Sequence, residues 1–218
     1  MTSLLEKHKV VSLGCSCFCM KYISTHIKGQ QYNIFDYIGT SMWSILELLK
    51  NNFDGLMDKE NIKKIPIKHD YPSIHTNAKY YVRFLHERMD EKNIDITINA
   101  NERRIQRFKS MLNNEGTIIF LRFEESQENR IKYDEYNEYT KKPEHDYVLE
   151  TSKWLKNNTK LKFRIIHFGT SPTKYDEDNN IIFINVDLND FTWNNCHTRI
   201  NDTLNNHFEL IENAIKDL

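Results

Sequence analysis

Three cysteines at alternate positions follow a short apolar run near the N-terminus, in the stretch HKVVSLGCSCFCMKYI at residues 8–23. The run KVVSL is typical of a buried strand, and the segment after the cysteines has apolar residues at helical spacing. A thiol in the first turn of a helix lies near the positive end of the helix dipole, which lowers its pKa and favours the nucleophilic thiolate. Backbone N–H groups at the same helix start can hold an oxyanion. This stretch therefore offers a nucleophile and part of the stabilisation that acyl chemistry needs.

Other roles of these cysteines remain open. A zinc site needs about four ligands, whereas C-x-C-x-C supplies three, and Cys196 and His197 are the other neighbouring pair of ligand types. A redox pair more often has C-x-x-C spacing. Cysteine is also a small core residue, which is the role we favour for Cys15 and Cys19. We expect no bound metal and no cofactor, and no Gly-rich phosphate loop is present.

A thiol nucleophile needs a base within hydrogen-bond reach, and the base needs an orienting group. His86 lies near the end of the alternating run KYYVRFLHE at residues 79–87. His167 ends the buried run LKFRIIHFG and precedes a Gly-Thr-Ser turn, so it is the strongest competitor. His197 is a third candidate.

Two charged residues stand inside apolar segments. Asp36 lies between Phe35 and Tyr37, where a carboxylate needs a buried partner. It either orients a histidine or bonds nearby backbone N–H groups. Arg122 lies in the strand IIFLRF and either binds an acidic group of a substrate or pairs internally, and we favour the internal pair.

The elements that position these residues alternate between strand and helix patterns. We expect a single α/β domain over residues 1–218, with a polar excursion around 126–146. Its mostly parallel sheet is flanked by helices in three layers, as in Rossmann-like and flavodoxin-like folds, and the nucleophile turn follows the first strand. Strands are expected at 9–13, 79–87, 117–123, 161–169 and 180–187, and helices at 17–27, 41–53, 99–114, 147–158 and 199–218.

Composition narrows the classes of partner. Of the 218 residues, 39% are hydrophobic, enough for a core, and the formal net charge of -1 provides no field that would attract nucleic acid or a membrane surface. The start MTSLLEKHKV is too short and too charged for a signal peptide. We expect a cytoplasmic protein with reduced thiols, in the host cytoplasm if it is viral.

The motif SLGCSC at residues 12–17, followed by NIFDYIGTS at 33–41, resembles the opening of a bacterial and giant-virus family described as putative papain-like cysteine peptidase, a domain of unknown function. The family pattern is S-L-G-x-x-C and then Phe-Asp-aromatic. Ile34 stands here in place of the usual proline, and Tyr37 in place of the usual tryptophan. The segments RRIQRF and IIFLRF also resemble the family, which implies that the likeness extends over most of the chain.

The resemblance implies that Cys17 is the nucleophile. An F-x-H motif of the family is matched by Phe84 and His86, which implies that His86 is the base, with Asp36 to orient it. The expected activity is a cysteine-dependent hydrolase or acyltransferase acting on a peptide or a small acylated substrate. The alternation of strands and helices differs from the layout of papain.

Alternatives to this assignment also follow from resemblance. The turn is similar to that of hydrolases with a Gly-Asp-Ser nucleophile motif, which would make Ser16 the nucleophile, although Cys15 stands where the Asp would be. A related capsule-synthesis family resembles coenzyme A-dependent acetyltransferases, which implies acyl transfer to a sugar. A non-catalytic binding module of the same fold is the third possibility.

Overall fold

The computed structural model describes residues 2–15, 17–29, 31–65, 74–84, 89, 92–124, 142–192 and 194–218. A five-stranded sheet forms its centre, in the order β1-β6-β7-β9-β8. The first four of these strands are parallel, and only β8 is antiparallel to its neighbour. Their bounds are β1 Lys9–Ser12, β6 Thr117–Phe123, β7 Lys162–Gly169, β8 Lys174–Asp176 and β9 Ile181–Asn185.

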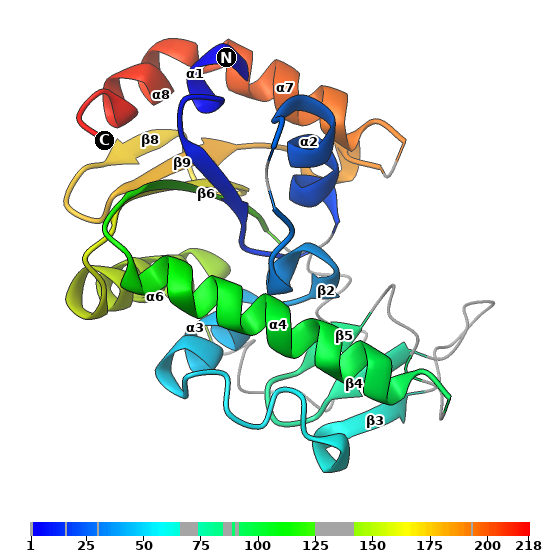
Figure 1. Cartoon of the computed structure of the whole chain (residues 1–218). Helices are drawn as coiled ribbons and strands as arrows, with labels where there is room; N and C mark the ends of the chain where they lie inside the picture. The colour runs from blue at the N-terminus through cyan, green and yellow to red at the C-terminus, as the bar shows by residue number, and fades with distance from the viewer. Residues whose placement is uncertain are drawn as a thin grey trace.

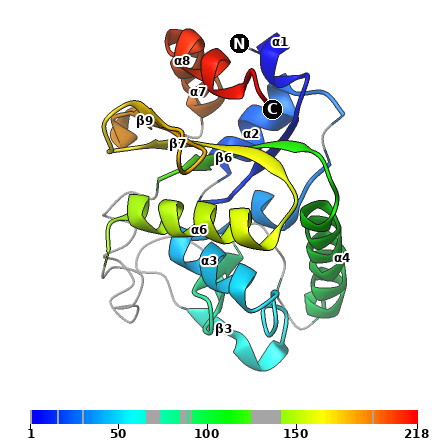
Figure 2. The same ribbon diagram turned by 90° about the vertical axis from the view of Figure 1, so that its left-hand side faces the viewer.

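Helices cover both faces of this sheet, so the molecule has three layers (Figure 1). On one face lie α1 (Thr2–Leu5), α2 (Phe18–His26), α7 (Cys196–Asn206) and α8 (Phe208–Ile215). On the other lie α3 (Met42–Lys50), α4 (Ile94–Asn113) and α6 (Glu144–Asn158). The view in Figure 2 shows the same two layers. The predicted three-layer α/β architecture is confirmed.

The layers follow from the alternation of side chains along each strand. In β6, Ile118 and Phe120 pack in the core beneath α3, α4 and α6, whereas Ile119, Leu121 and Phe123 pack against α2, α7 and α8. Because both faces are covered by helices, the parallel strands are apolar on both sides. Arg122 is two residues after Phe120, so its side chain points to the same face of the sheet, the one covered by α6.

A second sheet, which the sequence analysis did not predict, lies beyond α3 and α4 (Figure 1). It is antiparallel in the order β2-β5-β4-β3. Its strands are β2 Ile38–Gly39, β3 Ile62–Ile65, β4 Ile74–Asn77 and β5 Val82–Phe84. The expected strand at 79–87 is therefore shorter among the described residues, since 79–81 form a turn. Val82 and Phe84 belong to the same buried core as α3 and α4.

Other boundaries also differ from the sequence prediction. α4 begins five residues before the predicted helix at 99, and the predicted closing helix is divided at His207 into α7 and α8. The expected polar excursion at 126–146 falls mostly outside the described residues, and α6 begins within it at Glu144. Ser41 caps α3, because its Oγ accepts a hydrogen bond from the Ser44 backbone N–H at 3.1 Å.

No helix in the described ranges combines the length and apolar character that crossing a membrane requires.

Gly14 is the residue that lets β1 approach the loop before α3. Its φ is +71°, and a Cβ at this position would lie 2.3 Å from Thr40 Oγ1. Gly29 offers a matched comparison, because its φ is +74° but a Cβ there would have no atom within 4 Å. Both positions therefore need a positive φ, but only at Gly14 would a Cβ collide with a neighbouring side chain.

We predict that Gly14→Ala lowers the free energy of unfolding by at least about 1 kcal/mol more than Gly29→Ala does. Both alanines incur the left-handed conformation, which costs about 1–2 kcal/mol, while only the first overpacks its site. Urea unfolding of the two variants measures the difference. Equal destabilisation would show that the contact between Gly14 and Thr40 is not tight.

Candidate active site

The turn after β1 is formed by two consecutive residues in the left-handed region, Gly14 with φ +71° and Cys15 with φ +82°. A non-glycine residue in this region is strained and persists when its surroundings hold it there. The holding contacts are hydrogen bonds from the Gly14 N–H to Ser12 Oγ at 3.1 Å and from the Cys15 N–H to Thr40 Oγ1 at 3.4 Å. The chain is thereby redirected from the sheet into α2 within a few residues.

Cys17 is the N-cap of α2, at the carboxyl end of β1, as the sequence predicts. Its backbone carbonyl accepts a hydrogen bond from the Lys21 N–H at 2.8 Å, and the residue is 5% exposed. Burial raises the pKa of its thiol to about 11, and the nearby Cys196 and Asp36 add to the rise. The expected lowering of the Cys17 pKa by the helix start is therefore wrong, because desolvation of the thiolate outweighs it.

The other cysteines of the stretch differ in their settings. Cys19 is fully buried in the core between α2 and the sheet, as expected. Cys15 is 6% exposed, so it is buried, in keeping with the core role favoured for it, but it is no more buried than Cys17. All four cysteines of the chain are free thiols. Ser16, the alternative nucleophile, lies outside the described residues.

Asp36 is 4% exposed and belongs to the short 3-10 helix η1 (Ile34–Asp36). Its carboxylate accepts hydrogen bonds from the backbone N–H of Asn33 at 2.5 Å and from Asn33 Nδ2 at 3.3 Å. Asn33 Oδ1 in turn accepts one from the Phe35 N–H, which completes a capping box. Bonding to local backbone, one of the two roles expected for Asp36, is thus present. Burial raises the pKa of Asp36 to about 7, although the bonds from Asn33 and the nearby Arg104 oppose the rise.

His86 lies outside the described residues, so its position relative to Cys17 stays a prediction. The strand before it, β5, ends at Phe84, which pairs with Ile38. Gly14 packs against the segment from Phe35 to Thr40. A Cβ placed on Gly14 would lie 3.5 Å from the carbonyl oxygen of Phe35 and 3.6 Å from that of Ile38. The cysteine turn and the end of β5 therefore flank the same segment.

Arg122 is fully buried on the α6 side of the sheet. Its Nε and Nη2 lie 2.8 Å and 2.6 Å from Glu144 Oε1, in the first turn of α6. Its Nη1 donates to the carbonyl oxygens of Leu13, at 3.0 Å, and Thr40, at 2.9 Å. The internal pair that the sequence analysis favoured is therefore present, and the guanidinium connects β1, β2 and α6.

His167 is the partner of Arg122 in the register of β6 and β7, and it is fully buried. Its Nε2 lies 4.0 Å from Glu144 Oε1, which makes an ion pair when the imidazole is protonated. Glu124, directly after β6, accepts a hydrogen bond from the Thr170 N–H at 2.8 Å, and its side chain flanks Gly169 together with the His167 ring.

Neither Glu124 nor Glu144 is among the candidate residues that the sequence predicts. Glu144 stood in the segment predicted to be a polar excursion, and Glu124 follows a strand without a recognisable motif. Only their positions in the sequence could have indicated them. Glu124 directly follows the apolar strand β6, and Glu144 is the first residue of α6 and precedes the apolar residues of that helix.

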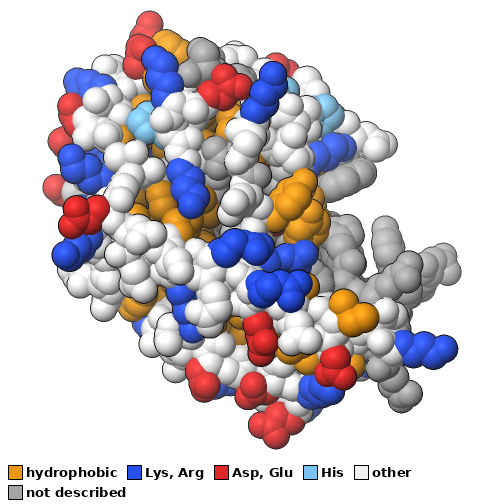
Figure 3. Space-filling model, in the orientation of Figure 1, with side chains coloured by type: hydrophobic (Ala, Val, Ile, Leu, Met, Phe, Trp, Pro, Cys, Tyr) orange, Lys and Arg blue, Asp and Glu red, His pale blue; other side chains and the backbone are white. Residues whose placement is uncertain are grey.

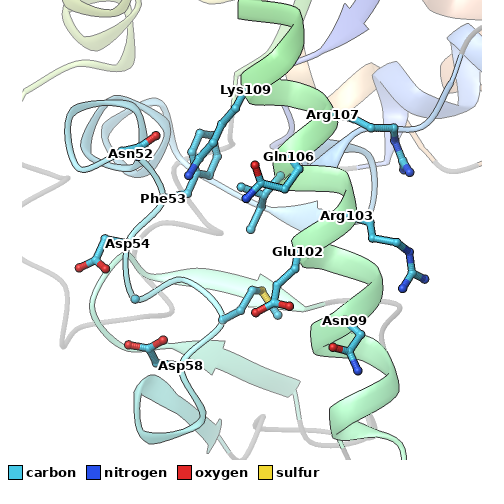
Figure 4. Close-up of a pocket in the computed structure, with 13 residues that line it drawn as sticks. Asn52, Phe53, Asp54, Asp58, Asn99, Glu102, Arg103, Gln106, Arg107 and Lys109 are labelled. Atoms are coloured by element: carbon cyan, nitrogen blue, oxygen red, sulfur yellow. The ribbon is translucent and has the colours of Figure 1, made fainter.

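A cavity of about 230 Å³ adjoins the carboxyl end of β1. Ser12, Asn33 and Asp36 form its polar side, and Val10 and Ile23 are part of its apolar wall. A larger cavity, of about 1020 Å³, lies elsewhere, between α4 and the loop at 52–58, and no cysteine lines it (Figure 4). No cysteine lines the smaller cavity either, but Ser12 does, and its Oγ accepts the hydrogen bond from the Gly14 N–H. We therefore place the candidate site at the smaller cavity.

Nucleophilic chemistry at Cys17 would start from a neutral thiol. A thiol with a pKa near 11 is protonated at neutral pH, so attack requires a base that takes the proton as the bond forms. Among the described residues no group of three or more metal-ligating side chains comes together.

Residues 8–168 match a protein family described as "Putative papain-like cysteine peptidase". No curated protein and no solved structure matches the chain.

We predict that Cys17 alkylates with iodoacetamide about a hundredfold more slowly than free cysteine at pH 7, because its thiolate fraction is smaller by that order. The rate should rise about tenfold per pH unit beyond pH 9. Peptide mass mapping of the alkylated protein separates Cys17 from the other thiols. Rapid labelling at pH 7 with no further rise would contradict the raised pKa.

Asp36 should make stability depend on pH. Its pKa is raised on folding, so the unfolded state ionises first, near pH 4, and the native state loses stability as the pH rises from about 4 to about 7. The loss is on the order of a few kcal/mol. The free energy of unfolding of the wild type minus that of Asp36→Asn should be larger at pH 4.5 than at pH 8. An equal difference at both pH values would show that Asp36 titrates normally.

Proposed function

The chain belongs to the family described as putative papain-like cysteine peptidases, and on this basis we propose that it is a cysteine-dependent hydrolase with Cys17 as the nucleophile. The observation that carries the proposal is the strained turn at Gly14 and Cys15, which delivers Cys17 to the start of α2. Strained backbone at a strand-to-helix turn is a common feature of catalytic sites. The cavity beside Ser12 and Asp36 gives a substrate access to this end of β1.

In the proposed reaction, the Cys17 sulfur attacks the carbonyl carbon of a peptide or ester while a histidine takes the thiol proton. The tetrahedral oxyanion accepts hydrogen bonds from backbone N–H groups at the start of α2, where a helix has no internal acceptor for its first amides. The protonated histidine then gives its proton to the leaving group as the bond to it breaks. Water hydrolyses the resulting thioester, assisted by the same histidine.

His86 is our first assignment for the base. It follows β5, whose last residue, Phe84, pairs with Ile38, two residues after Asp36. A carboxylate has about four acceptor sites, and the bonds from Asn33 occupy two of those of Asp36. The remaining sites can accept a hydrogen bond that orients His86. His167 is the alternative base, with Glu144 as the neighbouring carboxylate. Arg122 acts from inside the protein in this proposal, by holding the carbonyl of Leu13 before the turn.

Acyl transfer is a second candidate outcome of the same chemistry. Cys15 and Cys17 are each at most 6% exposed, so an acyl group on either sulfur would be shielded from water. Shielding favours an alcohol acceptor that binds specifically, such as a sugar hydroxyl, over hydrolysis. Product analysis with and without added sugar separates transfer from hydrolysis.

The test is a matched set of alanine variants assayed on a panel of p-nitrophenyl esters and fluorogenic peptides. Cys17→Ala should lower kcat/KM by about a thousandfold or more, because the nucleophile is lost. Cys19→Ala, two residues away in the core, should stay within a few fold. His86→Ala should match Cys17→Ala, whereas a loss confined to His167→Ala would transfer the base role to His167.

Intact mass spectrometry of the wild type after a short incubation with an ester should show the added acyl group, absent from Cys17→Ala. Thermal unfolding confirms that each variant folds. Wild-type turnover by folded Cys17→Ala would exclude Cys17 as the nucleophile. Cys15 and Ser16 are the alternative nucleophiles of the same turn, and wild-type turnover by Cys15→Ala or Ser16→Ala would exclude the residue replaced.

A further inference from the structure

Helix α4 carries three arginines close together, Arg103, Arg104 and Arg107. Arg103 and Arg107 are exposed and one turn apart, so they lie on the same side of the helix. Neither makes an ion pair with any described residue. Figure 3 shows basic side chains gathered over the middle of α4, next to hydrophobic ones. Arg103 and Arg107 therefore carry positive charge that no carboxylate of the described residues neutralises by pairing.

The acidic residues of the neighbouring large cavity are Asp54 and Asp58, in the loop at 52–58, and Glu102 on α4 itself. Arg103 and Arg107 extend away from Asp54 and Asp58, whereas Lys109 extends toward the cavity (Figure 4). Lys109 Nζ lies 5.8 Å from the centre of the Phe53 ring. Arg103 and Arg107 are also among the residues that line the large cavity, but their side chains extend in a different direction from that of Lys109 (Figure 4).

Two tyrosines complete the surface that the arginines face. The Arg104 guanidinium lies 4.9 Å from the centre of the Tyr37 ring, and the Tyr37 and Tyr32 rings are 5.3 Å apart. Arg107 Nη2 donates to the carbonyl oxygen of Tyr32 at 3.2 Å. Tyr32 is 47% exposed, which is unusual for a large aromatic side chain. We call Tyr32, Tyr37, Arg103, Arg104 and Arg107 the arginine–tyrosine surface.

This surface adjoins the candidate active site. Tyr32 also lines the 230 Å³ cavity, together with Asn33, Asp36 and Ser12. Lys28, a further cation, lines the same cavity. A ligand held at the arginines can therefore extend past Tyr32 toward the carboxyl end of β1, where the cysteine turn begins.

We propose that the arginine–tyrosine surface binds the phosphate group of a small phosphorylated substrate. The proposal rests on the proposed function, because it names the substrate class of that site. Guanidinium groups present planar forks of N–H donors that match phosphate oxygens, and they hold this geometry better than lysine does. Two arginines one turn apart can bind one phosphate together, and the exposed Tyr32 ring offers a face on which a planar part of the ligand stacks.

The test is isothermal titration calorimetry with inorganic pyrophosphate as the probe. The double variant Arg103→Gln/Arg107→Gln should bind pyrophosphate at least tenfold more weakly than the wild type, while Lys109→Gln should differ by less than twofold. Lys109 is the matched control, because it is a cation on the same helix whose side chain extends in a different direction from those of the two arginines (Figure 4). The wild-type affinity should also fall as salt rises, since the contact is ionic.

Equal affinity of the double variant and the wild type, or an equal loss in Lys109→Gln, would overturn the proposal, and so would wild-type protein that does not bind the probe. Binding of a single-stranded oligonucleotide through these arginines more tightly than pyrophosphate would also overturn it, in favour of a nucleic-acid partner. Cys17→Ala should bind pyrophosphate as the wild type does. The binding result is therefore independent of the thiol chemistry, and either proposal can fail alone.

Discussion

The Arg122 guanidinium is the interaction on which the geometry of the candidate site depends. It is a buried charge, and a buried charge is tolerated only when it is paired and its donors are bonded. Glu144 supplies the opposite charge from the first turn of α6, and the carbonyls of Leu13 and Thr40 accept from Nη1. A single side chain in β6 thereby fixes the ends of β1 and β2 and the start of α6. Removing either ion would leave the other uncompensated inside the protein, which costs about 3–5 kcal/mol in buried pairs.

Fixing Leu13 and Thr40 has a direct consequence for the cysteine turn between them. Thr40 presents its carbonyl to Arg122 and its Oγ1 to the Cys15 N–H, so one residue links the ion pair to the strained turn. The left-handed conformation of Cys15 is disfavoured by about 1–2 kcal/mol in an isolated chain. It is stable here because hydrogen bonds from Arg122 fix the backbone at Leu13 and at Thr40, and Thr40 in turn bonds the Cys15 N–H. Gly14 is required at the closest approach to Thr40, where no Cβ fits.

Much of the large sheet could be predicted from the sequence, because its four parallel strands are apolar runs long enough to stand out, such as TIIFLRF. The strand β8, Lys174–Asp176, could not, since a three-residue polar strand exists only by pairing with β9. Two strands of the small sheet, β2 and β3, could not be predicted for the same reason. β2 has only two residues, and β3, with the sequence IKKI, has charged residues at its centre. In the site, the cysteine turn carries a local motif, whereas Glu144 meets Arg122 only through the packing of α6. The high pKa of Cys17 is likewise a property of burial, which its neighbours in sequence do not reveal.

Burial of the cysteine turn also constrains the kind of catalysis that this fold can support. A resting thiolate–imidazolium pair needs a thiol whose pKa is lowered, and the pKa of Cys17 is raised instead. In the proposed reaction, charge therefore develops on the sulfur as substrate arrives and a base removes the proton, as in hydrolases with a serine nucleophile. In that regime the helix start contributes by stabilising the oxyanion rather than the free thiolate. The buried setting that disfavours the resting anion strengthens these hydrogen bonds once the anion forms, because the local dielectric is low. A protonated resting thiol and an active site are thus consistent in this architecture.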